Sequence, residues 1–291
     1  MSLIPRDAAV AARRRLYQPE ANEGDDLRFF SETLNAEQVI RYNRILSVYT
    51  ESKRLKMTIS QEDLQKMATG KGEAVLLYHV WSLLPRNWVF DCVIHYVMKE
   101  MPTLLGTTNP AVAFFSSFFF TKLFQEGQSD DFGQGKEGDF NYKGVESWTK
   151  KRLTQPIDKM KTLIFFRNQS NMHWVVYAIF IDDKTIQEFN SLPGGKNGDV
   201  EVLEGLYTWL EIEMLVAGTI LNKAEWQLLP SDSDTTPKQR NSDDCGIFML
   251  LFGVCIAQGL PLGLVSQERV ATARSLLILH WEIIIGRSGR K

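Results

Sequence analysis

The chain has 291 residues, of which 44% are hydrophobic and 23% charged, and its formal net charge is -2. This composition supports a folded core, and the near-neutral charge gives no electrostatic reason to expect a nucleic-acid partner. Three cysteines argue against a disulfide framework and favour a reducing intracellular compartment, nucleus or cytoplasm. No segment predicts a membrane span, and the N-terminus lacks the apolar region of a secretory signal.

In chain order, residues 1–30 are expected to form a flexible tail, and residues 31–291 a folded domain. Hydrophobic periodicity and turn residues predict helices and a sheet containing a hairpin, which together indicate an α+β class. The predicted helices cover residues 36–55, 88–101, 111–124, 199–217 and 265–285. Strands are predicted at 161–166 and 226–229, an apolar segment at 73–84, and a surface loop at 125–142.

The hairpin brings two polar residues together. His173 precedes a strand over 174–181, residues 182–184 form a turn, and the partner strand over 185–189 ends before Asn190. In an antiparallel pair the start of one strand lies beside the end of the other. We therefore predict that Asn190 neighbours His173 and accepts its Nδ1–H, which would fix the tautomer. His79, His95 and His280 lie in apolar helical stretches and are interpreted as packing or surface residues.

Cys245 lies where a polar loop meets an apolar helix. Residues 232–244 are rich in Asp, Ser and Pro, and the run from Gly246 is long and apolar. Ser242, Asp243 and Asp244 are available to cap this helix, and its N-terminus should favour a thiolate. The alternative is a buried structural cysteine, which fits Cys92 and Cys255 well because each lies inside an apolar run.

These motifs resemble the ubiquitin-like-protein-specific cysteine proteases, the SUMO (sentrin) proteases. His173-Trp174, a hairpin ending Asn190-Ser191-Leu192, and the run Q-R-N-S-D-D-C-G-I-F from Gln239 follow the family's order. Further segments match it at residues 55–64, 88–94, 114–123 and 148–151. The resemblance covers about residues 34–281 and implies a papain-like protease fold of the SUMO-protease type, with a central mixed sheet flanked by helices. Residues 31–291 would then be the catalytic domain.

The resemblance assigns a role to each candidate catalytic residue. Cys245 would be the nucleophile, His173 its base, and Asn190 the group that orients His173. The family usually has Asp at this last position. Asn190 can still accept from the imidazole but stabilises imidazolium less, so it affects the expected rate of cleavage more than the type of reaction. Gln239, six residues before Cys245, matches the oxyanion-hole Gln; without the resemblance it would be taken as a surface loop residue. No metal or cofactor is implied.

Two tryptophans and one acidic residue are predicted to bind the substrate. Family members clamp a C-terminal Gly-Gly in a tunnel roofed by Trp side chains, and Trp174 and Trp88 occupy the matching positions. Two flat indoles leave room for glycine but not for a Cβ, although core packing is the alternative for both. Asp91 matches a family acid that contacts a basic residue of the modifier, and a solvent-exposed helix acid is the alternative there.

The sequence therefore predicts a monomeric thiol protease or isopeptidase that cleaves after the Gly-Gly of a ubiquitin-like modifier, with SUMO as the first expectation. Its partners would be that modifier and proteins conjugated to it through lysine, with no nucleic acid and no membrane. Alternatives are a deubiquitinase or a protease for another such modifier, a Ser/Thr acetyltransferase effector of the same fold, and a catalytically weak modifier-binding module. The segment at 73–84 departs from the family pattern, and it could be a local helix that covers the core or could reshape the nearby modifier-binding surface. The loop at 125–142 is a second insertion, before the Trp148 segment.

Overall fold

A computed structural model describes residues 30–31, 33–54, 75, 77–104, 109–125, 138–192, 200–231 and 234–288. The predicted tail at 1–30 therefore lies almost wholly outside the described residues, as do segment 55–64 and most of the predicted loop at 125–142. Within the part of the chain that is described, no helix is both long and apolar enough to cross a membrane.

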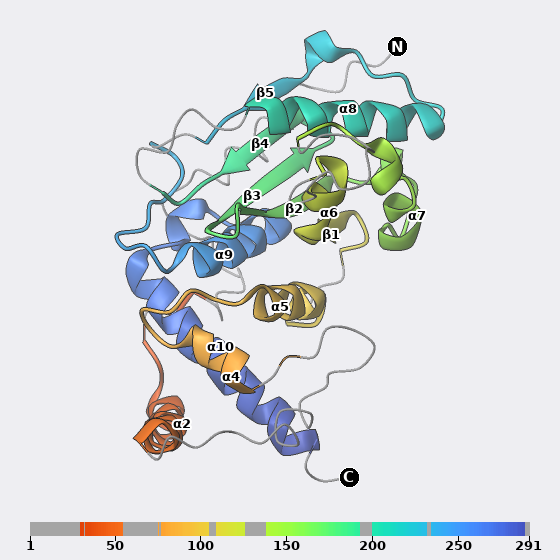
Figure 1. Ribbon diagram of the computed structural model, residues 1–291. Coiled ribbons are helices and arrows are strands. Elements are labelled where there is room, and N and C mark those ends of the chain that lie inside the picture. Colours follow the sequence, from red (N-terminus) through yellow and green to blue (C-terminus); the bar gives the residue numbers. More distant parts are fainter. Residues whose placement is uncertain are drawn as a thin grey trace.

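A five-stranded mixed sheet forms the centre of the molecule (Figure 1). The strands lie side by side in chain order: β1 (Val112–Phe115), β2 (Thr162–Gln169), β3 (His173–Phe180), β4 (Thr185–Phe189) and β5 (Gln227–Leu229). The β1–β2 and β4–β5 pairs are parallel, whereas β2–β3 and β3–β4 are antiparallel. The predicted hairpin is the β3–β4 pair, with its strand bounds displaced by one residue at most.

Helices cover both faces of this sheet, as Figure 1 shows. On one face lie α6 (Phe118–Leu123), α7 (Trp148–Arg152) and α8 (Val200–Val216); on the other lie α5 (Asp91–Leu104), α9 (Cys245–Gln258) and α10 (Gln267–Ser288). Because both faces are covered, β3 is buried along its whole length, and successive residues such as Val175 and Val176 enter two separate hydrophobic cores. The predicted α+β class with a flanked mixed sheet is confirmed.

Helix α2 (Ala36–Arg54) and several shorter elements are also described. Helix α2 packs on α10. The apolar segment at 73–84 contains α4 (Leu77–Val80) and η1 (Trp81–Leu83), which pack on α5 and α10 and so cover the core. The remaining short 3-10 turns are η2 (Tyr142–Gly144), η3 (Ile157–Lys159), η4 (Lys223–Glu225) and η5 (Leu262–Leu264).

Two helix predictions need correction. The predicted helix at 111–124 is the strand β1 followed by the short helix α6. An apolar run of this kind suits either structure, and parallel pairing of Val112 to Phe115 with β2 decides for the strand. The helix predicted at 88–101 begins only at Asp91, so Trp88 lies in a non-helical segment before it, and the helix continues past Pro102 to Leu104.

Candidate active site

The hairpin places His173 and Asn190 in direct contact. His173 Nε2 lies 2.8 Å from Asn190 Oδ1. A carbonyl oxygen only accepts, so the imidazole donates from Nε2. The predicted neighbourhood is confirmed, but the predicted donor atom, Nδ1–H, is wrong. The hydrogen bond instead leaves Nδ1 unprotonated in the neutral ring, which makes it the atom able to accept a proton.

Asn190 is itself held by its surroundings. Its Oδ1 also accepts from the Leu192 backbone N–H at 2.9 Å, which fixes the orientation of the side-chain amide. The Asn190 backbone N–H donates to Ser231 Oγ at 3.0 Å, and its carbonyl accepts from Lys238 Nζ at 2.8 Å. These bonds, from three different segments, leave the imidazole of His173 with a rigid acceptor.

Cys245 is the first residue of α9, as predicted, and lies beside the start of β3. The backbone N–H groups of Trp174 and Gly246 lie near its sulfur, where they favour the ionised form and so act to lower the pKa. Because Trp174 directly follows His173, the start of α9 and the start of β3 bring Cys245 and His173 into the same part of the molecule. A Cβ added to Gly246 would lie 3.3 Å from Ile94 and 3.4 Å from Trp174, which shows how closely α9 packs on these residues.

Burial acts against the thiolate that the helix N-terminus was expected to favour at Cys245. Burial raises the pKa of the Cys245 thiol; the N–H groups of Trp174 and Gly246 and the positive charge of Arg274 only partly oppose this effect. Burial also lowers the pKa of His173, and the hydrogen bond that its ring donates to Asn190 only partly opposes that shift. Both shifts disfavour the charged forms of these residues, the thiolate of Cys245 and the imidazolium of His173.

Gln239 is buried, not a surface loop residue. Its backbone N–H donates to the Ser191 carbonyl at 2.8 Å, which ties the loop before α9 to the end of the hairpin. Its side-chain Nε2 donates to the Asn241 carbonyl at 2.6 Å, and its Oε1 accepts from Ser191 Oγ at 2.6 Å. An amide nitrogen carries two hydrogens, so a second one remains for another acceptor.

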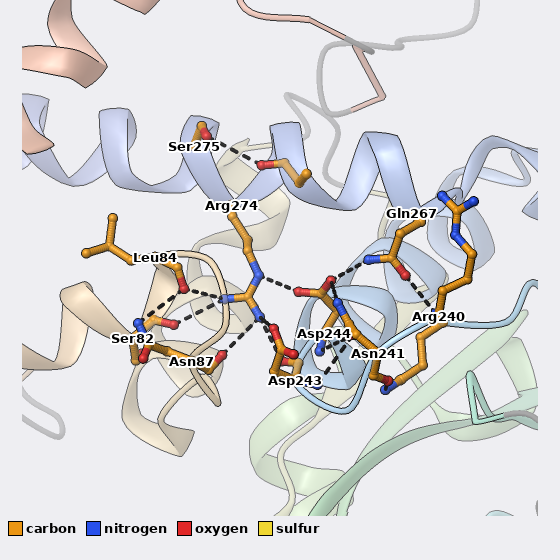
Figure 2. A network of polar contacts seen from close by, with 12 residues as sticks. Ser82, Leu84, Asn87, Arg240, Asn241, Asp243, Asp244, Gln267, Arg274 and Ser275 are labelled. Carbon is orange, nitrogen blue, oxygen red and sulfur yellow. Dashed lines mark hydrogen bonds and ion pairs between the residues drawn. The ribbon is translucent and has the colours of Figure 1, made fainter.

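A buried arginine fixes the loop that delivers Cys245 (Figure 2). Arg274, from α10, is 1% exposed, and its Nε donates to Asp244 Oδ1 at 2.6 Å. Asp244 Oδ2 accepts from Asn241 Nδ2 at 2.7 Å and from Gln267 Nε2. Asp244 is the N-cap of α9, yet its carboxylate makes no capping bond, contrary to the expected capping role. The carboxylate is instead committed to Arg274, Asn241 and Gln267.

The same guanidinium reaches the segment that carries Trp88. It donates to the backbone carbonyls of Ser82, Leu84 and Asn87 at 3.1, 3.4 and 3.1 Å, and to that of Asp243 at 2.7 Å. Figure 2 shows these acceptors on both sides of the arginine. Arg274 therefore links the loop before Trp88 to the loop before Cys245.

The three predicted substrate residues differ in exposure. Trp88 is 54% exposed, whereas Trp174 is 6% exposed and has the ring of His95 at its edge, 6.5 Å between centroids. Asp91 is exposed at the start of α5, and its carboxylate accepts from the Cys92 N–H at 2.8 Å. The segment holding Trp88 reaches the candidate nucleophile through Val89, whose Cβ is 3.5 Å from the position of an added Cβ on Gly246.

The sequence model of the Ulp1 protease family, C-terminal catalytic domain, matches residues 87–275. The chain belongs to the Ulp1 protease family. The match contains Trp88, His173, Asn190, Gln239, Cys245 and Arg274, whereas Ser82 and Leu84, two of the carbonyl acceptors of Arg274, precede it.

Individual relatives agree with the family match. The chain is 28% identical over 193 residues to ubiquitin-like-specific protease 1 of Saccharomyces cerevisiae, and 29% identical over 209 residues to ubiquitin-like-specific protease 1A of Arabidopsis thaliana. These matches cover 66% and 69% of this chain but only 27% and 38% of the relatives. The chain therefore spans well under half of the length of these Ulp1-family proteins.

The fold is also found among solved structures. The C-terminal Ulp1 protease domain in complex with Smt3, the yeast ortholog of SUMO, has a TM-score of 0.61 and 22% identity, with 87% of this chain and 97% of that chain covered. A Chaetomium thermophilum Ulp1-like SUMO protease catalytic domain has a TM-score of 0.57 at 20% identity. At these identities the similarity shows the shared Ulp1 fold.

Two residues of the site were not found from the sequence. Ser191 was part of a quoted motif but received no role, and its contact with Gln239 spans 48 residues of chain. Arg274 lies inside α10, where an arginine ordinarily faces solvent, so nothing in its local pattern indicates burial. The position of Ser191, a polar residue just after a strand end, is the signal that could have indicated its role.

Proposed function

We propose that this chain is a thiol protease or isopeptidase that cleaves after the C-terminal Gly-Gly of a ubiquitin-like modifier, with SUMO as the substrate tested first. The single observation that carries the proposal is the convergence of Cys245, the His173–Asn190 pair and Gln239 in a chain of the Ulp1 family. Free thiols at Cys92, Cys245 and Cys255 fit action in a reducing compartment, and we place it in the nucleus or cytoplasm.

In the first step the Cys245 sulfur attacks the carbonyl carbon of the last glycine. The thiol proton passes to Nδ1 of His173, because Nε2 is held by Asn190. His173 then protonates the departing amine, the lysine Nζ of a conjugate or the α-amine of a precursor tail, and a thioester remains on Cys245. Water hydrolyses this thioester, with His173 as its base, and frees both the modifier carboxylate and the thiol.

Charge on the carbonyl oxygen needs donors in place before the attack. The Asp244 carboxylate does not cap the first turn of α9, because it accepts from Arg274 instead. The N–H groups of that turn are therefore not bonded to the Asp244 side chain. The backbone N–H of Cys245 and the second hydrogen of Gln239 Nε2 are assigned to this oxyanion hole. Such donors act most strongly in the transition state, so they should affect kcat more than KM.

The Gly-Gly requirement is assigned to Trp174 and Trp88. Their segments approach one another at Gly246, where an added Cβ would meet Ile94, Trp174 and Val89 within 3.5 Å. Two flat indoles on either side of a substrate strand would leave room for glycine but not for a Cβ. The exposed carboxylate of Asp91 lies at the start of α5, outside the core, where a basic residue of the modifier could bind it.

The test is a substrate panel with one fluorogenic amide at the scissile position. SUMO ending in Gly-Gly, SUMO ending in Gly-Ala, and ubiquitin ending in Gly-Gly are compared, with Cys245→Ala as the control that lacks the nucleophile. We expect turnover of SUMO Gly-Gly alone, and binding without turnover by Cys245→Ala. Preference for ubiquitin would reassign the substrate. Binding by the wild type without turnover would indicate a binding module, and acetyl transfer from acetyl-CoA with no cleavage would indicate the acetyltransferase alternative.

A further inference from the structure

Ser191 makes two contacts with Gln239, the residue to which the proposed function assigns an oxyanion-hole donor. Its carbonyl accepts the Gln239 backbone N–H at 2.8 Å, and its hydroxyl donates to Gln239 Oε1 at 2.6 Å. Both residues are buried, with exposed fractions of 1% and 2%. Each contact joins the end of the β3–β4 hairpin to the loop that precedes α9.

The contacts determine which way the Gln239 amide faces. The Asn241 carbonyl only accepts, so the amide must present Nε2 to it, and that distance is 2.6 Å. The Oε1 atom then faces Ser191, whose hydroxyl can donate to it. With both ends of the amide bonded, the second hydrogen on Nε2 has a fixed direction.

We propose that Ser191 is a positioning residue for the oxyanion hole, which acts by holding the Gln239 amide in its donating orientation. This inference rests on the proposed function, because it assigns Ser191 to the same reaction. Asn190 orients the base through its side chain, and the next residue orients the oxyanion donor through its hydroxyl. The two residues that follow β4 thus position both the base and the oxyanion donor.

Removing the hydroxyl leaves Gln239 Oε1 buried without this donor. A single neutral hydrogen bond of this kind corresponds to about 2- to 12-fold in rate. Ser191→Ala should therefore lower kcat for SUMO Gly-Gly by about 2- to 12-fold and leave KM nearly unchanged, because the Gln239 donor acts in the transition state. Ser191→Thr, which keeps a hydroxyl, should retain most of kcat. Ser275→Ala, which removes a hydroxyl bonded only to its own helix at the Ala271 carbonyl, is the matched control.

The decisive experiment is the double-variant cycle with Gln239→Ala. If Ser191 acts through Gln239, adding Ser191→Ala to Gln239→Ala should produce no further loss of kcat. A merely structural role predicts that the two losses multiply. Equal kcat for Ser191→Ala and wild type, or multiplying losses, would overturn the inference, whereas a wild type that cleaves no substrate would overturn the proposed function instead.

A second readout does not depend on turnover. In a ¹⁵N spectrum the side-chain NH₂ signals of Gln239 are identified by their loss in Gln239→Ala. Ser191→Ala should accelerate their exchange with D₂O, because the amide is no longer held at Oε1. Unchanged exchange in Ser191→Ala, in a protein that unfolds at the same urea concentration as wild type, would equally contradict the inference.

Discussion

Replacing Arg274 with methionine should destabilise the protein strongly. Methionine has a similar length but no donors, so Arg274→Met leaves the buried carboxylate of Asp244 without its ion-pair partner. It also removes the donor to four backbone carbonyls, those of Ser82, Leu84, Asn87 and Asp243. Breaking a buried pair by removing one partner costs about 3–5 kcal/mol. Asp244 keeps two neutral donors, Asn241 and Gln267, so we expect the loss in free energy of unfolding to lie inside that range rather than above it.

The assay is urea unfolding, read as the free energy of unfolding in water, with a thermal melt beside it. For a domain of this size class each kcal/mol shifts Tm by about 2–4 °C, so Arg274→Met should melt roughly 6–20 °C lower. Arg240→Met is the matched control, because it removes the Arg240–Glu268 pair, which is also anchored on α10 but is exposed on both sides. The control should melt close to wild type. A loss of less than about 1 kcal/mol in Arg274→Met would refute the view that this ion pair holds the two loops together.

Three further predictions concern the chemistry. Burial lowers the pKa of His173, so the acid limb of the kcat/KM profile should lie below about pH 6.5. Asn190→Asp would place a charge beside Nε2, raise the His173 pKa and move that limb to higher pH; an unmoved limb would show that Asn190 does not contact the base in solution. Gln239→Ala should lower kcat by about 10²–10³ at nearly constant KM, and a change confined to KM would contradict its oxyanion role. Trp88→Ala should leave stability nearly unchanged, because Trp88 is largely exposed, and should improve cleavage of Gly-Ala relative to Gly-Gly; an unchanged ratio would remove Trp88 from the specificity site.

The part of the site that local sequence rules determine was predictable. A tight hairpin with clear strand bounds forces His173 and Asn190 together, and a polar-to-apolar change marks the start of α9 at Cys245. The fold class was also predictable, because local hydrophobic patterns indicate most of the helices and strands along the chain. The error at 111–124 arose because a continuous apolar run fits a strand and a helix equally well until its partner strand is known.

What depends on long-range packing was not predictable. The choice of Nε2 over Nδ1 is set by the angle at which the His173 ring meets Asn190, which the strand register does not specify. Burial raises the pKa of the Cys245 thiol, whereas a helix N-terminus taken alone favours the thiolate. The roles of Ser191 and Arg274 depend on partners far away in the chain, so no local pattern contained them.

The most direct test of the whole account uses SUMO that ends in a thiol-reactive electrophile in place of the scissile amide. Wild-type protein is mixed with this probe and its intact mass and adduct position are measured by mass spectrometry. We expect one covalent adduct, located on Cys245, with none on Cys92 or Cys255, which have no catalytic role in the proposed reaction. Cys245→Ala should bind the probe without reacting. An adduct on either other cysteine, or no adduct on the wild type, would contradict the claim that Cys245 is the nucleophile of a Gly-Gly-specific protease.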